Sequence, residues 1–522
     1  MRIIIVLIVL SSFIIANGNN RELPIGLTDL EKLRINEIYT MGRDTDPPPV
    51  PIRNIAEYER MQGVIIRYPF GISLDIIAEM SEDVFIYCLV SANQQNSAFQ
   101  AMENGSVIMQ NVEFVLGPTD SYWTRDYGPW WVVDGNNNIS IVDFTYNRPR
   151  PNDNDAPIKI SDHLDVPYFA TDIIHAGGNY MTDGMGIGAS SDLVYVENTI
   201  SNQEVHLKMQ QYYGIDTYHV VEDPNNTYID HIDCWGKYLS PTKVLIRAVP
   251  TNHAQYNEIE QTASYFSSSL NTWGEPWQLY RVWTPGNEPY TNSIILNEKV
   301  LVPTTGGSWD DEAISTYQEA LPGYEILGYS GTWESTDALH CRVKGIPDLQ
   351  MLQIFHNPLN DGTNPNDSGY AIEALIDDIS QSGLIDDSLK VYWKIPDSVT
   401  WNFEELYLED DTETWRGVIP TISDSNMIQY FIRAADSSGR IESSPLAGWH
   451  TFYAHPINIC ADWSIGDLDY SGEIDLFDIL LLVDYYNNNV NGICPGTVSD
   501  INSDNQISIL DIIFLVNIVI NQ

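Results

Sequence analysis

Basic residues are scarce in this chain. Lysine and arginine together account for 25 of its 522 residues, against 72 aspartate and glutamate residues, and the formal net charge is -47. Such a surface repels phosphate backbones, so nucleic acid is not an expected partner, whereas cationic ligands are favoured. The acidic excess is equally consistent with a surface that only keeps the protein soluble.

Long apolar runs are also rare, and the longest ends at Ile15 near the N-terminus. This run is shorter than the roughly 20 residues that a bilayer-spanning helix needs. A single charge at Arg2, a short apolar stretch and small residues at Ala16 and Gly18 are typical of a signal peptide, which we place at 1–18. We therefore expect a soluble mature protein without a membrane span, secreted or periplasmic, that starts near Asn19.

Five cysteines are few for an exported chain of this length. Cys460 and Cys494 flank the C-terminal module and either form a disulfide or remain free thiols. Cys88 and Cys234 lie in apolar segments and are expected to be buried packing residues. Cys341 is the unpaired thiol that we expect to be reactive.

Apolar patterning divides the chain after a proline-rich lead-in at 19–56. In the region 57–378, strand candidates often occur in close pairs before a helix, which fits a single doubly wound sheet poorly. The pattern favours repeated small β-rich units with helices outside, in an α/β domain. The predicted strands are 64–68, 84–90, 112–116, 131–133, 139–146, 193–196, 244–249, 294–302 and 351–355, and the predicted helices are 74–82, 203–213, 254–270 and 310–321.

The composition changes in the region 379–457. Short strands predicted at 389–394, 414–419, 428–433 and 451–453 are separated by Asp/Ser/Gly turns. This spacing is typical of an all-β, immunoglobulin-like sandwich. The region contains no cluster of titratable residues, so we expect a structural or presenting role for it.

Two copies of a twelve-residue pattern occupy the last region, 458–522. The loops 467–478 and 500–511 each place oxygen-bearing side chains at positions one, three, five, nine and twelve, and an apolar helix follows each loop. This spacing suits calcium, which takes six to eight oxygen ligands. The expected ligands are Asp467, Asp469, Ser471, Asp475, Asp478, Asp500, Asn502, Asp504, Ser508 and Asp511.

These tandem loops resemble the dockerin family, which implies a small α module that docks to a cohesin-type protein. Two departures from the EF-hand pattern concern position twelve, where Asp stands in place of Glu as is usual in dockerins, and Asn505, which replaces the glycine of the second loop. Asparagine tolerates a positive φ, so the second site is retained. A calcium-stabilised terminal cap without a partner remains the alternative.

The motif HIDCW at 231–235 holds His231 and Asp233 two residues apart. If the segment is extended, both side chains leave the same face and enter one pocket. A histidine there can transfer protons near neutral pH while the aspartate stays anionic. The alternative is a capped turn with a purely structural His–Asp pair.

The motif WTRDYGPWW at 123–131 provides a second carboxylate beside an aromatic ring. Asp126 can accept two hydrogen bonds from a guanidinium group, and Trp123 can cover the plane of the cation. The alternative is a structural ion pair between Arg125 and Asp126 at a turn.

Cys341 lies in the motif LHCRVKGIPD at 339–348 and is the candidate nucleophile. A bound cation and a nearby imidazolium would lower the pKa of its thiol. The adjacent His340 is too close in sequence for a catalytic contact to be assumed, so His231 is the better proton carrier. Inert packing of the thiol is the alternative.

Together with GGNYMTDG at 177–184 and YTNS at 290–293, these motifs resemble the bacterial peptidylarginine deiminase and agmatine deiminase family of the guanidino-modifying superfamily. The resemblance covers roughly 40–375 and implies a five-bladed α/β propeller with the site on its axis. It also implies that Asp126 and Asp233 bind the guanidinium group, that His231 acts as acid and base, that Cys341 attacks, and that Asn292 supports the site.

The stretch YNRPRPN at 146–152 resembles the segment that, in the exported peptidylarginine type, provides two arginines for the carboxylate of a C-terminal arginine. Arg148 and Arg150 are a sensible anion clamp. The alternative is a solvent-facing pair that balances Asp153 and Asp155. The resemblance further implies that Gly178, Tyr228 and Ile229 belong to the substrate-binding residues.

We therefore predict an exported hydrolase that converts peptidyl arginine, preferably C-terminal, to citrulline and ammonia through a Cys341 thiouronium intermediate. The prediction needs no organic cofactor or catalytic metal, and calcium is expected only in the C-terminal loops. The alternatives are an agmatine or free-arginine deiminase, an amidinotransferase, a papain-like protease, and a catalytically inactive peptide-binding protein.

Overall fold

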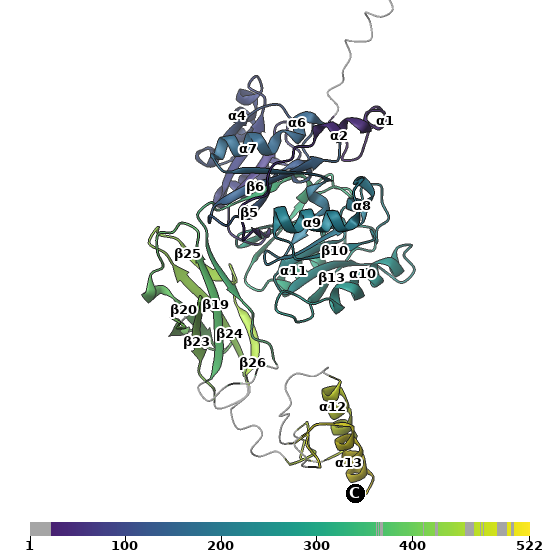
Figure 1. Cartoon of the computed structure of the whole chain (residues 1–522), viewed down its shortest axis with the longest axis vertical. Coiled ribbons are helices and arrows are strands. Elements are labelled where there is room, and N and C mark those ends of the chain that lie inside the picture. The colour runs from purple at the N-terminus through teal and green to yellow at the C-terminus, as the bar shows by residue number, and fades with distance from the viewer. Residues whose placement is uncertain are drawn as a thin grey trace, which may run out of the picture. The chain divides into compact units, whose positions relative to one another are not determined.

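The computed structural model describes residues 22–361, 363, 365, 369–410, 412–422, 426–454, 464–469, 471–472, 474–487, 498–502 and 506–521. The chain divides into two compact units, Met1–Leu349 and Gln350–Gln522 (Figure 1). The predicted signal peptide at 1–18, Cys460, Cys494 and Asp504 lie outside the described residues. In the part that is described, every helix is too short or too polar to cross a bilayer.

In the described part of the first unit, the strands form five small sheets. One sheet has the order β1-β5-β6-β7, and its strands are β1 (Arg53–Asn54), β5 (Trp130–Val133), β6 (Ile139–Tyr146) and β7 (Tyr168–His175). The next three sheets are built from β8 (Met181–Thr182), β9 (Ile187–Ser191) and β10 (Thr217–Val221), from β11 (Gly236–Ser240), β12 (Lys243–Ala248) and β13 (Gln278–Trp283), and from β14 (Ile294–Leu296), β15 (Lys299–Thr304) and β16 (Glu325–Ser330). The fifth has the order β17-β2-β3-β4, with β17 (Lys344–Pro347), β2 (Met61–Arg67), β3 (Phe85–Val90) and β4 (Val112–Leu116).

All five sheets repeat one pattern of pairing. A first strand runs antiparallel to a second, which runs parallel to a third, as in the pairs Trp130 with Val142 and Ile141 with Tyr168. In the fifth sheet the first strand is β17, from the end of the unit, and its partner β2 comes from the beginning. The repeated units expected from the sequence are therefore present, and their number equals the five that the family resemblance implies.

Helices connect the parallel strands, as a crossover connection requires. They are α3 (Leu74–Asp83), α4 (Gln95–Asn104), α6 (Pro151–Asn154), α7 (Ala156–Leu164), α8 (Leu193–Glu197), α9 (Asn202–Tyr213), α10 (Tyr256–Ser268) and α11 (Asp310–Ala320), and a short turn η2 (Met109–Asn111) precedes β4. Helix α10 contacts β12 and β13, and α11 contacts β13 and β16 (Figure 1).

Helix α9 shows how the local sequence defines such an element. Ser201 and Glu204 form a capping box at its start, and Gly214 ends it with a φ of 67°. Its inward face buries Met209 and Tyr213 in an aromatic core shared with β6, β7 and β10. Apolar burial of this kind contributes about 1.5–3 kcal/mol per large side chain.

Two predicted elements differ from the structure. The segment 193–196 was expected to be a strand, but it forms α8, in which only Val194 is buried. The segment 294–302 was expected to be one strand, but it is the hairpin β14–β15. Asn297 adopts a φ of 55° at that turn, a conformation that asparagine tolerates better than most residues.

The described part of the second unit begins with two sheets that share one apolar core, which includes Tyr370, Val391, Tyr430 and Phe452. One sheet contains β18 (Leu352–His356), β19 (Tyr370–Asp378), β22 (Tyr407–Leu408) and β23 (Thr414–Ile419), and the other contains β20 (Lys390–Lys394), β21 (Asn402–Glu405), β24 (Asn426–Ala435), β25 (Ile441–Ser444) and β26 (His450–Ala454). A turn η6 (Asp386–Ser388) precedes β20. The boundary therefore falls after Leu349 and not after 378, because β18 and β19 pair with β23 rather than with the first unit.

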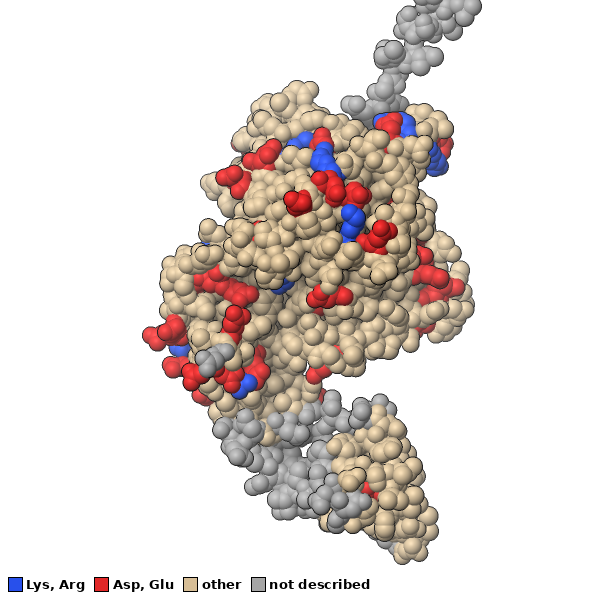
Figure 2. All heavy atoms as spheres, viewed as in Figure 1, with Lys and Arg blue, Asp and Glu red and all other residues tan. Residues whose placement is uncertain are grey.

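The C-terminal helices α12 (Leu476–Tyr486) and α13 (Ile509–Ile520) each start with a capping box, formed by Asp475 with Asp478 and by Ser508 with Asp511. Leu468, Leu482 and Leu515 are buried in a small core. In Figure 2 acidic side chains cover more of the visible face of the chain than basic ones, as the composition requires.

Candidate active site

The predicted catalytic residues occupy equivalent positions in four of the five sheets. Asp126 lies in α5 (Thr124–Tyr127) before β5, His231 and Asp233 lie at η4 (Ile232–Cys234) before β11, and Asn292 lies before β14. Cys341 lies in η5 (His340–Arg342), just before β17. The fifth equivalent segment is η3 (Gly177–Asn179) before β8, and α5 contacts both η3 and η5.

Three of these side chains converge on Gly178. A β-carbon built at this glycine would lie 2.6 Å from Asp126 Oδ1, 2.8 Å from His231 Nδ1 and 3.1 Å from Asp233 Oδ2. His231 Nδ1 lies 3.5 Å from Asp126 Oδ1. A glycine is required here because any larger residue would fill the space between the carboxylates and the imidazole.

Cys341 joins the same cluster. Its Sγ lies 3.6 Å from Asp233 Oδ2. Asn292 holds the residue from two sides, because its Nδ2 donates to Sγ at 3.3 Å and its Oδ1 accepts from the Cys341 amide at 3.3 Å. All five predicted catalytic residues are buried and lie in one cluster, as the sequence predicted.

Burial determines how this cluster titrates. Burial, and then the nearby charges of Asp233 and Asp126, raise the pKa of the Cys341 thiol well above its usual range. Burial and the Asp233 charge likewise raise the pKa of Asp126 well above its usual range. Burial lowers the pKa of His231 to about 3. The free site therefore favours a protonated thiol and a neutral imidazole.

Asp233 behaves differently from the other groups. Burial by itself would raise its pKa, but a hydrogen bond and the positive charge of His340 bring that pKa below the usual value. The two atoms that make this contact, His340 Nδ1 and Asp233 Oδ2, are 2.7 Å apart. No catalytic contact between His340 and Cys341 was assumed from the sequence, and in the structure the His340 side chain instead holds the Asp233 carboxylate that reaches the thiol.

The carboxylate of Glu57 contacts the other ring nitrogen of His340, and this residue was not identified from the sequence. Its Oε2 lies 2.6 Å from His340 Nε2 and 2.8 Å from Arg125 Nη2, and its Oε1 lies 2.7 Å from Lys237 Nζ. These three cations hold the pKa of Glu57 well below its usual range, although burial opposes them. No sequence motif identifies Glu57 as part of the site, because the residues that it contacts are distant in sequence.

The local backbone also differs from the prediction. The extended segment that was considered around Asp233 is not present, because η4 is a 3-10 turn that starts after His231. For the same reason Cys234 does not point away from Asp233 as on a strand: its Sγ lies 3.6 Å from Asp233 Oδ1, although it is buried in the core as expected. The alternative pairing of Arg125 with Asp126 is absent, because Arg125 binds Glu57 instead.

Three predicted substrate-binding residues contact the N-terminal lead-in. Trp123 is buried, its Nε1 donates to the Leu23 carbonyl at 3.1 Å, and its ring centre lies 5.5 Å from the Arg342 guanidinium carbon. Tyr228 is 69% exposed, whereas Ile229 is buried. Gly26 packs against both of these side chains.

The two arginines that were predicted to bind the substrate carboxylate are buried, and both already make hydrogen bonds within the chain. Arg150 is 1% exposed, and its Nε lies 2.7 Å from Glu31 Oε1. Arg148 Nε donates to the Ile25 carbonyl at 3.1 Å. Solvent exposure, the alternative for this pair, is also wrong because both guanidinium groups are buried. The charge of Arg148 nevertheless opposes the burial that raises the pKa of Asp126 and adds to the burial that lowers the pKa of His231.

Comparison with known proteins agrees with this geometry. Agmatine deiminase of Medicago truncatula is 23% identical over 321 residues, which is 50% of this chain and 83% of that protein. Agmatine deiminase of Ectopseudomonas mendocina is 22% identical over 289 residues, which is 46% of this chain and 77% of that protein. The solved agmatine deiminase of Enterococcus faecalis superposes with a TM-score of 0.52 at 17% identity, over 59% of this chain and 99% of that one, so the fold is shared.

A sequence profile described as Porphyromonas-type peptidyl-arginine deiminase matches residues 66–347. This match spans more than half of the chain and includes all five equivalent segments, from Asp126 to Cys341. The chain therefore belongs to the Porphyromonas-type peptidyl-arginine deiminase family, and it is a hydrolase of the guanidino-modifying superfamily.

Proposed function

We propose that the protein hydrolyses the guanidinium group of peptidyl arginine, preferably C-terminal, to citrulline and ammonia. The observation that carries this proposal is the convergence of Asp126, His231 and Asp233 on Gly178, with the Cys341 thiol 3.6 Å from Asp233. Two carboxylates on a buried site suit a planar cation, because the paired N–H donors of a guanidinium group match carboxylate oxygens.

The substrate itself would activate the nucleophile. The Cys341 thiol has a raised pKa in the free site because it is buried beside carboxylates. A guanidinium cation placed between Asp126 and Asp233 offsets those negative charges and stabilises the thiolate. His231, which is neutral in the free site, can then take the thiol proton and become the acid of the next step.

The bond changes balance without a cofactor. The Cys341 thiolate forms a bond to the guanidinium carbon, and the carbon–nitrogen bond breaks as His231 transfers its proton to the leaving ammonia. The product of this half-reaction is a thiouronium intermediate. His231 then removes a proton from water, the oxygen attacks the same carbon, and the carbon–sulfur bond breaks to release the ureido group and regenerate the thiolate.

The two candidate substrates differ at the end opposite the guanidinium group, where C-terminal arginine has a carboxylate. Arg148, whose charge acts on the catalytic cluster, supports recognition of a substrate carboxylate and thus of C-terminal arginine. The second candidate is agmatine, which has no carboxylate. It is favoured by the contact between Arg150 and Glu31, which leaves only one of the two arginines for an anion.

Ureido product formed from benzoyl-arginine, benzoyl-arginine amide and agmatine would test both candidates. We expect the highest kcat/KM with the free carboxylate, and no turnover by Cys341→Ser. A preference for agmatine would support the second candidate instead. Transfer to an added amine, peptide cleavage, or binding without ammonia release would each contradict a deiminase.

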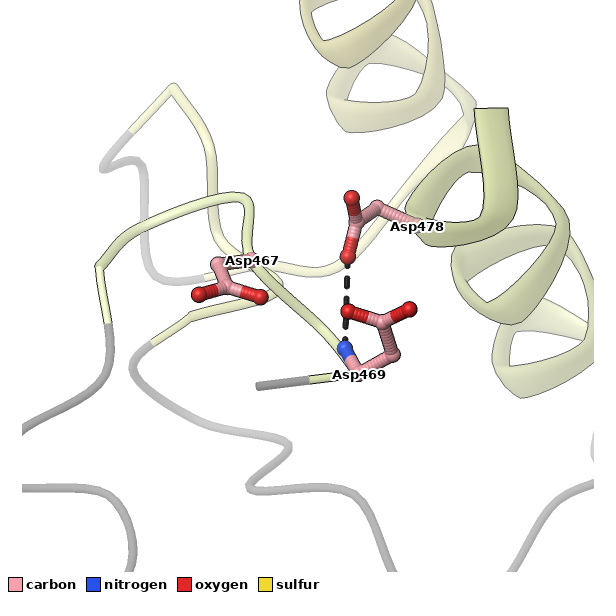
Figure 3. A group of neighbouring side chains, drawn as sticks. All are labelled: Asp467, Asp469 and Asp478. Atoms are coloured by element: carbon pink, nitrogen blue, oxygen red, sulfur yellow. Dashed lines mark hydrogen bonds between the residues drawn. The ribbon is translucent and has the colours of Figure 1, made fainter. Parts of the chain in front are cut away.

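Export through the N-terminal segment and calcium binding by the C-terminal loops are further parts of the proposal. The carboxylates of Asp467, Asp469 and Asp478 lie within 4.8 Å of one another (Figure 3). Gly472, at position six of the loop, has a φ of 85° and allows the sharp turn that an EF-hand loop needs. In the second loop Asp511 accepts from the Asn502 amide much as Asp478 accepts from the Asp469 amide.

The oxygen donors of the first loop fit calcium, although Asp475 also caps α12 through the Phe477 amide and would reach the ion less directly. Calcium, when bound, supplies charge that holds the loop together. We expect a melting transition of the C-terminal module that moves upward with added calcium and downward with a chelator. A transition that calcium leaves unchanged would contradict this part of the proposal.

The last part of the proposal is that the C-terminal module binds a cohesin-type protein. Equivalent positions of the two helices expose matching apolar side chains, with Leu476 and Ile509 at 60% and 58% and Leu480 and Ile513 at 51% each. Such a duplicated apolar face supports protein docking. Pull-down of a purified cohesin by the full chain in calcium, lost in a Leu480→Asp and Ile513→Asp double variant, would test it.

A further inference from the structure

The start of the described chain, residues 22–33, lies on the arginines that were predicted to bind the substrate carboxylate. Four successive carbonyls, at residues 23–26, accept hydrogen bonds from side chains of the catalytic unit. Leu23 accepts from Trp123, and Ile25 accepts from Arg148. The carbonyls of residues 24 and 26 both accept from Arg150 Nη2, at 2.7 and 3.1 Å.

The carboxylate of Glu31 completes this arrangement. Its Oε1 lies 2.7 Å from Arg150 Nε, and its Oε2 lies 3.3 Å from Arg150 Nη2. This side-on, two-point contact is the one that a guanidinium group offers to any carboxylate. The two side chains are 1% and 6% exposed, so the contact is shielded from solvent. Glu31 thus occupies the Nε–Nη2 edge of Arg150, the edge that a carboxylate in side-on contact would use.

The segment is attached mainly through polar contacts. Within residues 22–33, Ile25, Gly26 and Glu31 are the only buried residues. Leu30 and Leu33 are 75% and 83% exposed, so α1 (Asp29–Lys32) and its flanks contribute little apolar burial. A competing carboxylate can replace the Glu31 contact with one of the same kind, and the hydrophobic free energy that opposes movement of the segment comes mainly from Ile25, about 1.5–3 kcal/mol.

We propose that residues 22–33 are an internal ligand of the substrate-carboxylate subsite, and that Glu31 is a specificity-determining residue. A substrate carboxylate must displace Glu31 from Arg150, because two carboxylates cannot share one guanidinium edge and would repel each other. The intact chain therefore discriminates between a carboxylate and an amide less strongly than two free arginines would. The inference rests on the proposed function, since it assumes a guanidino substrate.

Glu31→Gln is the decisive variant, with Glu37→Gln as its matched control. Glutamine keeps an oxygen that can accept from the Thr28 amide and preserve the helix start, but it removes the charge from Arg150. Glu37 pairs with Arg34 just after this segment, and both side chains are 49% exposed. The ratio of kcat/KM for benzoyl-arginine over its amide should rise about tenfold or more in Glu31→Gln and stay unchanged in the control.

An unchanged ratio in an active Glu31→Gln enzyme would overturn the inference and leave the proposed function intact. Absence of ureido product from every guanidine in the unaltered chain would overturn the proposed function instead.

Hydrogen exchange provides a second measurement that does not depend on turnover or on the folding of the Glu31 variant. In Cys341→Ser, benzoyl-arginine should increase amide exchange in the peptide covering residues 22–33, and the amide compound should not. Equal exchange with both compounds, or with neither, would also overturn the inference.

Discussion

Removing the charge of Glu57 should destabilise the catalytic unit far more than removing a surface charge. Glu57 forms charge-assisted hydrogen bonds with His340 and Lys237 and an ion pair with Arg125, and its Oε1 also accepts from the Ile295 amide at 3.1 Å. In Glu57→Gln one oxygen becomes an NH₂ donor that faces two cations. The contacts with His340 and Arg125, worth about 1.5–3 kcal/mol each, are lost, so the free energy of unfolding should fall by about 3–6 kcal/mol.

Urea denaturation followed by tryptophan fluorescence would measure this loss. Glu260→Gln is the control, because Glu260 pairs with Arg281 where both side chains are partly exposed. Loss of this pair should lower the free energy of unfolding by less than about 1 kcal/mol. If the two variants lost similar stability, the reasoning about the buried network would be refuted.

Glu57→Gln should also change the pH profile of the reaction. Burial and the charges of Arg125 and Lys237 lower the pKa of His340, Glu57 opposes them, and His340 in turn lowers the pKa of Asp233. Without Glu57 the pKa of Asp233 rises, so the acidic limb of kcat/KM should move to higher pH. A purely structural role for Glu57 would lower the amount of folded enzyme and leave that limb in place.

Three further predictions concern the catalytic cluster itself. Alkylation of Cys341 by iodoacetamide should keep accelerating with pH up to about pH 9, because burial and neighbouring carboxylates raise the pKa of its thiol; a plateau at neutral pH would contradict this. Asn292→Ala should lower kcat by about ten- to a hundredfold with little change in KM, because Asn292 bonds both the sulfur and the amide of the nucleophile; an unchanged kcat would exclude that role. Gly178→Ala should abolish competition by guanidinium compounds, because its methyl group would lie 2.6 Å from Asp126 Oδ1, whereas Gly236→Ala, with its nearest contact at 3.7 Å, should bind them normally; equal binding by both variants would argue against a site centred on Gly178.

Much of the catalytic cluster could be predicted because its chemistry is carried by short motifs. A thiol, a histidine and two aspartates were identified from residue type and local context, the asparagine followed only from the family resemblance, and the structure brings all five together. Regular elements were predicted where periodicity is strong, as in the strands 112–116 and 139–146 and the helix 310–321. Their signal is local, so it survives without knowledge of the fold.

The failures have a common physical origin. The helix α8 was mistaken for a strand because its apolar residues have high β propensity and tertiary context overrides so short a pattern. Glu57 and Glu31 were missed because their partners lie far away in sequence, at His340 and at Arg150. Neither spacing nor periodicity records a contact of that kind.

The sequence by itself determined which reaction the chain is equipped for, because nucleophile, proton carrier and cation-binding carboxylates are properties of residue types. The tertiary structure alone decided how these groups are tuned. It raises the pKa of the Cys341 thiol through burial beside carboxylates, and it places Glu31 on Arg150. Both effects depend on distance and on exclusion of water, which only the folded chain sets.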